Sequence, residues 1–162
     1  MSDDELMSEA GKFRRNLLNF FWRSGVSPFE GEDLVQETYL RLWKYRREYV
    51  PTAKLSTFLF LLARQVRLDA LRRETRRERR EKSWGSGRSD VQEASPACER
   101  EEVRRAVARL PEPMREVVEL GVFQELPYAE VAEILEIPVG TVKSRMYNAI
   151  RKLKEMLDDK GS

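Results

Sequence analysis

Small polar side chains and cations share one side of a predicted helix near the C-terminus. At about 100° per residue, residues 139–157 divide into an apolar face and an opposite polar face. The apolar face holds Val142, Met146, Ala149, Ile150, Leu153 and Leu157, and the polar face holds Gly140, Thr141, Ser144, Asn148 and Arg151, with Lys143 and Arg145 at its margins. Short polar groups can contact base edges in the major groove, and flanking cations can bind phosphates. The pattern favours duplex DNA binding over a simpler interpretation, a helical hairpin with a charged surface.

A second, shorter helix is predicted immediately before this one, at Tyr128–Leu135. Its inner face is formed by Tyr128, Val131, Ala132 and Leu135. Ala132 is small, which allows the two helices to cross closely. Residues 136–138 separate the helices, and this spacing is typical of a helix-turn-helix.

The N-terminal half places aromatic residues beside a run of arginines. The aromatic residues are Tyr39, Trp43, Tyr45, Tyr49, Phe58 and Phe60. Single-stranded nucleic acid needs stacking platforms and a groove that binds phosphates, and aromatic and cationic side chains supply both. Packed helices also need large side chains in their core. The sequence leaves both roles open for each aromatic residue, and core packing is the commoner of the two.

Charge is strongly separated along the chain, although the formal net charge is only +2. Residues 64–82 carry a net charge of +5 and residues 139–157 one of +4, whereas residues 90–136 carry −7. Two basic segments around an acidic one indicate two separate contacts with a polyanion. A solvated, ion-paired helix surface would explain the same charges, so the charge pattern alone does not decide between the two.

The composition excludes several kinds of chemistry. The chain has 162 residues, no histidine and one cysteine, Cys98, which excludes His-based triads, zinc sites built from Cys and His, and an internal disulfide. The longest apolar run is residues 58–63, whereas a membrane span needs about 20 residues. A lone cysteine and no signal peptide predict a cytoplasmic protein. We expect no membrane insertion, no metal or other cofactor, and no enzymatic activity.

The periodic segments of the N-terminal half are predicted to be helices. Apolar residues recur at helical spacing over residues 6–21, and Gly25 and Pro28 end that run. Further helices are predicted at residues 32–49 and from Ser56 into the arginines.

Residues 83–95 are rich in Gly and Ser and predict a flexible linker. Beyond it, helices are predicted from Pro96 to Leu110, around residues 117–120, and at the two positions described above. No stretch alternates as a strand would. The prediction is an all-α fold of two small helical domains, residues 1–82 and 96–162, joined by the linker at 83–95, with a helix-turn-helix in the C-terminal domain.

Three stretches of the chain resemble one known family. Residues 33–43 (DLVQETYLRLW) resemble the polymerase-binding helix of bacterial extracytoplasmic-function (ECF) sigma factors of the sigma-70 family. Residues 57–64 (TFLFLLAR) and 69–73 (DALRR) look like that family's promoter-melting helix, and residues 137–145 (IPVGTVKSR) are similar to its helix-turn-helix. The resemblance covers nearly the whole chain, in the family's order and spacing.

The resemblance implies that the N-terminal domain binds the beta-prime clamp of core RNA polymerase and the unstacked bases of the minus-ten promoter element, while the C-terminal domain binds the minus-thirty-five element as duplex DNA. The implied polymerase-binding residues are Asp33, Gln36, Glu37 and Arg41. The implied minus-ten-binding residues are Phe58, Arg64, Gln65, Asp69, Arg72 and Arg73, and the implied minus-thirty-five-binding residues are Thr141, Lys143, Ser144, Arg145, Tyr147, Asn148 and Arg151. Many members of the family are held inactive by an anti-sigma factor, so such a protein is a further partner that the resemblance suggests.

Four residues depart from the family pattern. Phe58 stands where the family often has Trp, and Gln65 stands where it usually has Asn. Glu136 occupies a turn position where the family favours Gly, and a left-handed backbone there would cost about 1 kcal/mol. Asn148 stands where the family often has Arg. Because Arg prefers guanine and Asn prefers adenine, Asn148 predicts a changed minus-thirty-five preference.

Two other functions fit parts of the sequence. A helix-turn-helix transcription regulator that binds duplex DNA without joining polymerase would explain the C-terminal helices, but neither the 33–43 helix nor the aromatic residues beside the arginines. A metal-dependent nuclease or recombinase would need a pair of carboxylates in a pocket motif, and no such pair is evident.

Overall fold

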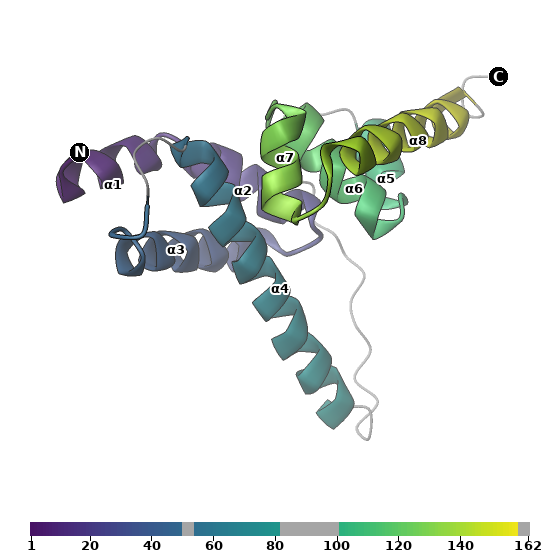
Figure 1. Cartoon of the computed structure of the whole chain (residues 1–162). Coiled ribbons are helices and arrows are strands. Elements are labelled where there is room, and N and C mark those ends of the chain that lie inside the picture. Colours follow the sequence, from purple (N-terminus) through teal and green to yellow (C-terminus); the bar gives the residue numbers. More distant parts are fainter. Residues whose placement is uncertain (50–53, 82–100, 159–162) are drawn as a thin grey trace. The chain divides into compact units, whose positions relative to one another are not determined.

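The structure is a computed structural model that describes residues 1–49, 54–81 and 101–158. Every regular element in these ranges is a helix, which confirms the all-α prediction (Figure 1). The chain divides into two compact units, Met1–Ser95 and Pro96–Ser162. The linker predicted at 83–95, the helix start predicted at Pro96, and Cys98 lie outside the described residues.

The first unit contains four helices, α1 (Asp3–Gly11), α2 (Arg14–Arg23), α3 (Pro28–Lys44) and α4 (Leu55–Glu81). Helix α3 packs against both α2 and α4, and α1 packs against α4. The second half of α4 extends beyond the other three helices of this unit (Figure 1).

The single N-terminal helix predicted over residues 6–21 is in fact two helices. Helix α1 ends at Gly11, and the Phe13 N–H donates to the Ala10 carbonyl at 3.1 Å. The Tyr39 hydroxyl, which belongs to α3, donates to the same carbonyl at 2.9 Å. A carbonyl at a helix end lacks its intrahelical partner, so this tertiary hydrogen bond helps to stabilise the break.

Helix α3 begins earlier than predicted because Pro28 starts this helix and does not merely end the previous run. Proline suits the first helical turn, where its missing N–H has no intrahelical partner to lose. The Ser27 hydroxyl caps the turn by accepting from the Glu30 N–H at 3.2 Å. The helix ends at Lys44, and residues 45–48 form turns. The predicted bounds, 32 and 49, were therefore wrong by one turn or slightly more at each end.

The core of the first unit has an aromatic part and an aliphatic part. Phe20 of α2 meets Phe60 of α4 edge to face, with ring centroids 5.7 Å apart. The aliphatic part contains Leu6, Ala10, Leu42, Leu59 and Leu62. Because Phe60 is 1% exposed, it is a core residue and takes no part in stacking on bases.

The second unit contains α5 (Glu101–Ala108), α6 (Glu112–Val118), a π-helical turn η1 (Glu119–Phe123), α7 (Tyr128–Leu135) and α8 (Val139–Asp158). Helix α8 packs against α5, α6 and α7. The predicted helix-turn-helix pair corresponds to α7 and α8.

One face of α8 forms the centre of the second unit. Val142, Met146 and Ala149 are buried there, as predicted. Ile150, which belongs to the same apolar face, is 42% exposed. Ile150 lies on the edge of the apolar face, about 80° from Val142, where the neighbouring helices no longer cover it.

The turn between α7 and α8 contains the expected left-handed residue. Glu136 has φ 56° and ψ 45°, and the Ile137 N–H donates to the Ala132 carbonyl at 3.0 Å. This is the hydrogen bond of a Schellman motif, which ends a helix and reverses the chain. The turn sets the short connection that the helix-turn-helix requires.

Candidate nucleic-acid interface

Helix α8 presents a polar outer face opposite its buried one. Of the residues predicted to bind the minus-thirty-five element, Lys143, Ser144, Tyr147 and Arg151 are exposed, while Thr141, Arg145 and Asn148 are half-buried. The Ser144 hydroxyl donates to the Gly140 carbonyl at 3.0 Å, so an oxygen lone pair still faces outward. The exposed set combines two cations with a hydroxyl and a phenol, which suits contact with phosphates and base edges.

Tyr147 is the most exposed large hydrophobic side chain of α8, at 68%. The helical projection of the sequence placed Ser144 and Asn148 on the polar face but did not single out Tyr147. Tyr147 was predicted as a DNA-binding residue only from the family resemblance. The spacing of Lys143, Tyr147 and Arg151, four residues apart, is the signal that projection could have used. The structure centres the exposed face nearer to Tyr147.

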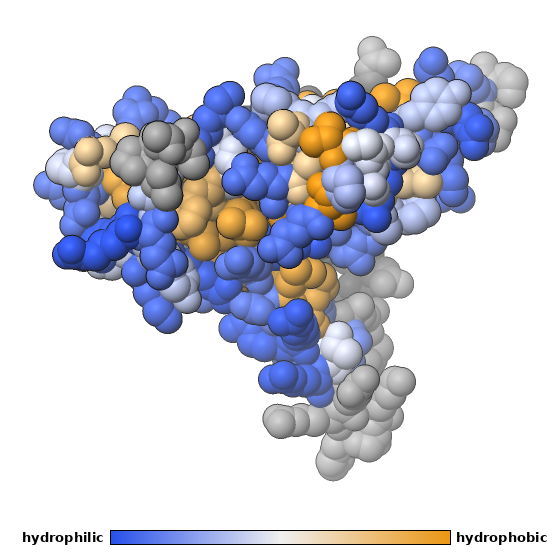
Figure 2. All heavy atoms as spheres, viewed as in Figure 1, coloured by the Kyte–Doolittle hydropathy of each residue, from blue (hydrophilic) through white to orange (hydrophobic). Residues whose placement is uncertain are grey.

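Helix α4 changes character along its length. Its first half is buried or half-buried except at Gln65, whereas every side chain from residue 71 to residue 77 is exposed, including Arg72 and Arg73. Figure 2 shows mostly hydrophilic surface over this second half of the helix. A row of exposed guanidinium groups on a projecting helix can follow a nucleic-acid backbone.

The other predicted minus-ten residues lie nearer to the core. Phe58 is half-buried, and its ring lies 5.6 Å from that of Tyr49, measured between centroids. Gln65 is exposed, and Arg64 is half-buried. Gln65 and Arg72 are seven residues apart, about two turns, so they lie on the same side of α4.

Helix α3 carries a stripe that combines polar and apolar exposed residues. Asp33 and Gln36, both predicted to bind polymerase, are exposed on it. The polymerase-binding residues predicted from the sequence left out three apolar residues on the same side, Phe29, Leu40 and Trp43, all of them exposed and Phe29 by 80%. Their spacing places them on the same side of the helix as Asp33 and Gln36, which the sequence already shows. Only the structure shows that they are exposed and not part of the core. We call these five residues the α3 stripe.

An open depression of about 330 Å³ lies beside the α3 stripe. Its lining residues are Arg14, Glu32, Asp33, Val35, Gln36 and Tyr39. Arg14 and Glu32 form an ion pair between α2 and α3 at its edge. The depression is mainly polar, and it adds concave surface next to the two polar residues of the stripe.

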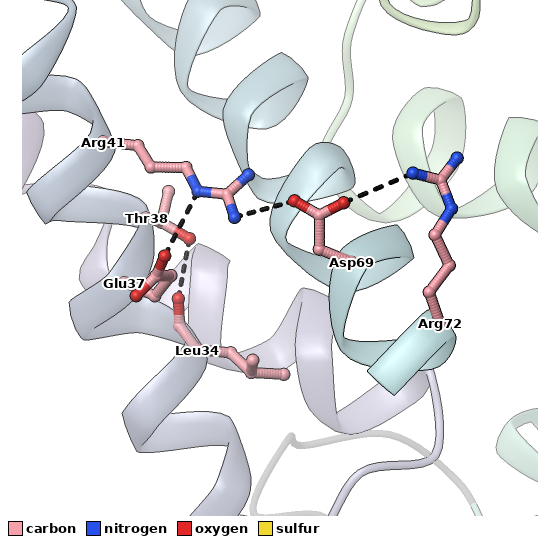
Figure 3. Close-up of polar contacts among 6 residues, drawn as sticks. All are labelled: Leu34, Glu37, Thr38, Arg41, Asp69 and Arg72. Carbon is pink, nitrogen blue, oxygen red and sulfur yellow. Dashed lines mark hydrogen bonds and ion pairs between the residues drawn. The ribbon is translucent and has the colours of Figure 1, made fainter. Parts of the chain in front are cut away.

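Glu37 and Arg41, also predicted to bind polymerase, belong to a chain of ion pairs that joins α3 to α4 (Figure 3). The Arg41 guanidinium donates to Asp69 at 2.8 Å and to Glu37 at 3.3 Å. Asp69 also lies 3.5 Å from Arg72. Partial burial alone would lower the pKa of Arg41, but its hydrogen bonds to Asp69 and Glu37 raise that pKa overall. Residues from two separately predicted sites therefore form one network.

The N-terminal turn of α3 lies within electrostatic range of the arginine half of α4. Partial burial and the negative charges of Glu74 and Asp33 raise the pKa of Glu30, which Arg73 opposes. Glu30 of α3 thus interacts electrostatically with Arg73 of α4.

No helix in the described part of the chain is both long enough and apolar enough to cross a membrane. No group of three or more His, Cys, Asp or Glu residues is arranged there to hold a metal ion.

Comparison with known families matches both units. Residues 10–77 match the family model described as Sigma-70 region 2, and residues 100–153 match the one described as Sigma-70, region 4. The regions correspond to the helices that carry the α3 stripe and the arginines of α4 in one unit, and the helix-turn-helix in the other.

Relatives and solved structures agree with this match. The ECF RNA polymerase sigma factor RpoE of Cereibacter sphaeroides is 30% identical over 146 residues, covering 88% of this chain and 81% of the relative. The ECF sigma factor SigK of Mycobacterium ulcerans is 32% identical over 134 residues, covering 78% and 72%. In fold, the chain is similar to the sigma factor RpoE of Bartonella quintana, solved in complex with the anti-sigma factor NepR (TM-score 0.74, 22% identity, 96% and 95% covered). It is also similar to CnrH in complex with the cytosolic domain of CnrY (TM-score 0.72, 20% identity, 98% and 90% covered).

The two region matches and the relatives above each cover a large part of the chain, and together the two regions span residues 10–77 and 100–153. The chain belongs to the ECF sigma factors of the sigma-70 family.

Proposed function

We propose that this sigma factor, which directs transcription initiation as a non-catalytic subunit of RNA polymerase, uses three separate surfaces. The α3 stripe binds the beta-prime clamp of core polymerase. The arginine half of α4 binds the single strand of the minus-ten element, and the outer face of α8 binds the minus-thirty-five duplex.

The proposal for the α3 stripe is supported by its mixture of side chains. Exposed aromatic and aliphatic residues beside a few polar groups are typical of protein interfaces. Phe29, Leu40 and Trp43 can supply the buried contacts, while Asp33 and Gln36 supply directional hydrogen bonds.

The proposal for α4 is supported by the exposed arginines and by the residues that precede them. Arg72 and Arg73 can bind phosphates, and Gln65 lies on the same side of the helix as Arg72. Phe58 is half-buried, so one part of its ring remains available for stacking against a base. Together these groups suit a single strand whose bases are unstacked.

The proposal for α8 is supported by its position as the second helix of a helix-turn-helix. The N-terminal part of such a helix enters the major groove. Its exposed residues there include Lys143, Ser144 and Tyr147.

Two partners and two domain boundaries complete the proposal. Domains at residues 1–82 and 96–162, with a linker at 83–95, accord with the separate matches to regions 2 and 4. An anti-sigma factor is a proposed partner because RpoE of Bartonella quintana was solved in complex with the anti-sigma factor NepR. We place the protein in the cytoplasm, where polymerase and promoters are found.

The observation that carries the proposal is the α3 stripe, because a regulator that only binds duplex DNA has no use for it. The test is competition for core polymerase between the wild-type chain and the double variant Asp33→Ala, Gln36→Ala. We expect the variant to compete at least tenfold less well, with unchanged helical content and unchanged duplex binding. Equal competition by the two proteins would contradict the proposal.

A further inference from the structure

Arg41 is the residue whose position differs most from its implied role. The α3 stripe includes Leu40, and the next residue is turned about 100° away around the helix. The Arg41 guanidinium lies toward α4, where its Nη2 donates to Asp69 Oδ2 at 2.8 Å (Figure 3). Its side chain is 20% exposed. Arg41 is therefore held between α3 and α4, and the stripe does not present it to a partner.

Asp69 is shared between two arginines, one from each helix. Its Oδ2 accepts from Arg41, while its Oδ1 lies 3.5 Å from Arg72 Nη1. A separation of 3.5 Å is longer than an ordinary hydrogen bond, so the contact with Arg72 is the weaker of the two. The Arg72 side chain is 72% exposed, and ion pairs at that exposure contribute little. A phosphate group can therefore displace Asp69 from Arg72 while Arg41 remains bound.

Asp69 also lies at the boundary between the two halves of α4. Val66 and Leu62, about one turn and two turns before it, are buried. The side chains of residues 71–77 are exposed. Asp69 is thus placed where the anchored half of the helix ends and the arginine half begins.

We propose that Arg41 is a positioning residue for promoter-strand binding, which acts by occupying Asp69 and so leaves the Arg72 guanidinium available to a backbone phosphate. If Arg41 is removed, the Asp69 carboxylate no longer shares its charge between two arginines and interacts with Arg72 alone of the two. The carboxylate then neutralises that guanidinium and repels the phosphate. Arg41 thereby affects DNA binding without touching DNA, and this inference rests on the proposed role of α4.

The test uses the full chain and a short fluorescent single-stranded oligonucleotide of mixed sequence, because phosphate contacts do not depend on sequence. Affinity is measured over a range of salt concentrations. We expect Arg41→Met to reduce the magnitude of the salt slope by about 0.7, the value for one phosphate contact with a single strand. Near 0.1 M salt, this loss corresponds to about fivefold weaker binding.

Two double variants separate this mechanism from a general loss of structure. Arg41→Met combined with Asp69→Asn should regain the wild-type affinity and slope, because a neutral amide no longer holds Arg72. Arg41→Met should add nothing in an Arg72→Ala background, because both changes remove the same phosphate contact.

Arg46→Met is the matched control. The Arg46 side chain is also 20% exposed, and it pairs with Asp3 at 3.0 Å, on α1 and not on α4. This variant should bind the oligonucleotide as the wild type does.

The outcomes distinguish the inference from the proposed function. If Arg72→Ala binds the oligonucleotide as the wild type does, the proposed role of α4 fails and the inference fails with it. If Arg72→Ala weakens binding but Arg41→Met does not, the inference alone is overturned. The inference is also overturned if Asp69→Asn fails to restore binding, or if Arg41→Met loses core polymerase affinity to the same extent as the Asp33→Ala, Gln36→Ala variant.

Discussion

Tyr147 and Asn148 are adjacent in the sequence, but they lie at different depths on α8. Tyr147 is 68% exposed, whereas Asn148 is half-buried at the margin of the outer face. The Asn148 amide can still donate to N7 and accept from N6 of adenine, if its end reaches into the groove. The two residues therefore divide the face into a centre, near Tyr147, and an edge from which Asn148 can contact one base.

This placement leads to a prediction about base preference. Replacing Asn148 with Arg should shift preference toward guanine at one position of the minus-thirty-five element, by roughly 1–3 kcal/mol, because a guanidinium pairs with O6 and N7 of guanine. The measurement is a binding-selection profile on randomised duplexes. Unchanged preference at every position would mean that Asn148 does not reach the bases.

Arg145→Ala is the comparison for that experiment. Arg145 is half-buried on the same side of the face as Asn148, one turn before it, and we expect it to contact phosphates. Its loss should weaken all duplexes about equally and reduce the salt slope by about 0.9, the value for one phosphate contact with duplex DNA. A base-specific change in this variant would assign Arg145 to base recognition instead.

At the scale of elements, the connection between α7 and α8 depends on one backbone conformation. Glu136 adopts a left-handed conformation that glycine tolerates better, because a β-carbon crowds the following carbonyl oxygen. The Schellman hydrogen bond from Ile137 to Ala132 compensates in part for this strain. The turn therefore retains strain that a single substitution can relieve.

We expect Glu136→Gly to raise the free energy of unfolding of the second unit by about 1 kcal/mol. Amide hydrogen exchange of α8 in the full chain measures this directly, because the first unit does not contribute to those amides. Glu133→Gly is the matched control, since Glu133 is an exposed residue inside α7. Glycine there should lower the free energy of unfolding by about 1 kcal/mol. If both variants lose stability, the left-handed turn does not form in solution.

At the scale of the whole molecule, each unit has its own buried core. The first unit encloses Phe21, Leu42 and Phe60 among others, and the second encloses Val117, Ile134 and Val142 among others. A unit that buries its own apolar residues does not need the other unit in order to fold.

We therefore expect the fragments 1–82 and 95–162 each to fold alone. Each should show helical circular dichroism and a cooperative thermal transition, and the two transitions should together reproduce that of the intact chain. The second fragment should retain duplex binding, and the first should retain affinity for core polymerase. A non-cooperative melt for either fragment would show that its core depends on the other part of the chain.

The sequence by itself determined the helical class, the helix-turn-helix and the separation of charge. Each of these depends on local spacing, which a helix converts directly into faces. The periods at Tyr128–Leu135 and residues 139–157 coincide with α7 and α8 to within one residue. The buried set Val142, Met146 and Ala149 follows from the same period.

The tertiary structure alone decided features that depend on residues far apart in the chain. Arg41 and Asp69 are 28 positions apart, so no local pattern predicts that they pair and remove Arg41 from the α3 stripe. Gly31 is buried beside the Trp22 indole. A β-carbon added at Gly31 would lie only 2.7 Å from the indole Nε1. The break after α1 likewise depends on Tyr39, 29 positions beyond Ala10. Such contacts arise from how the helices pack against one another, and helical periodicity specifies which face of a helix is buried but not which residue of another helix it will meet.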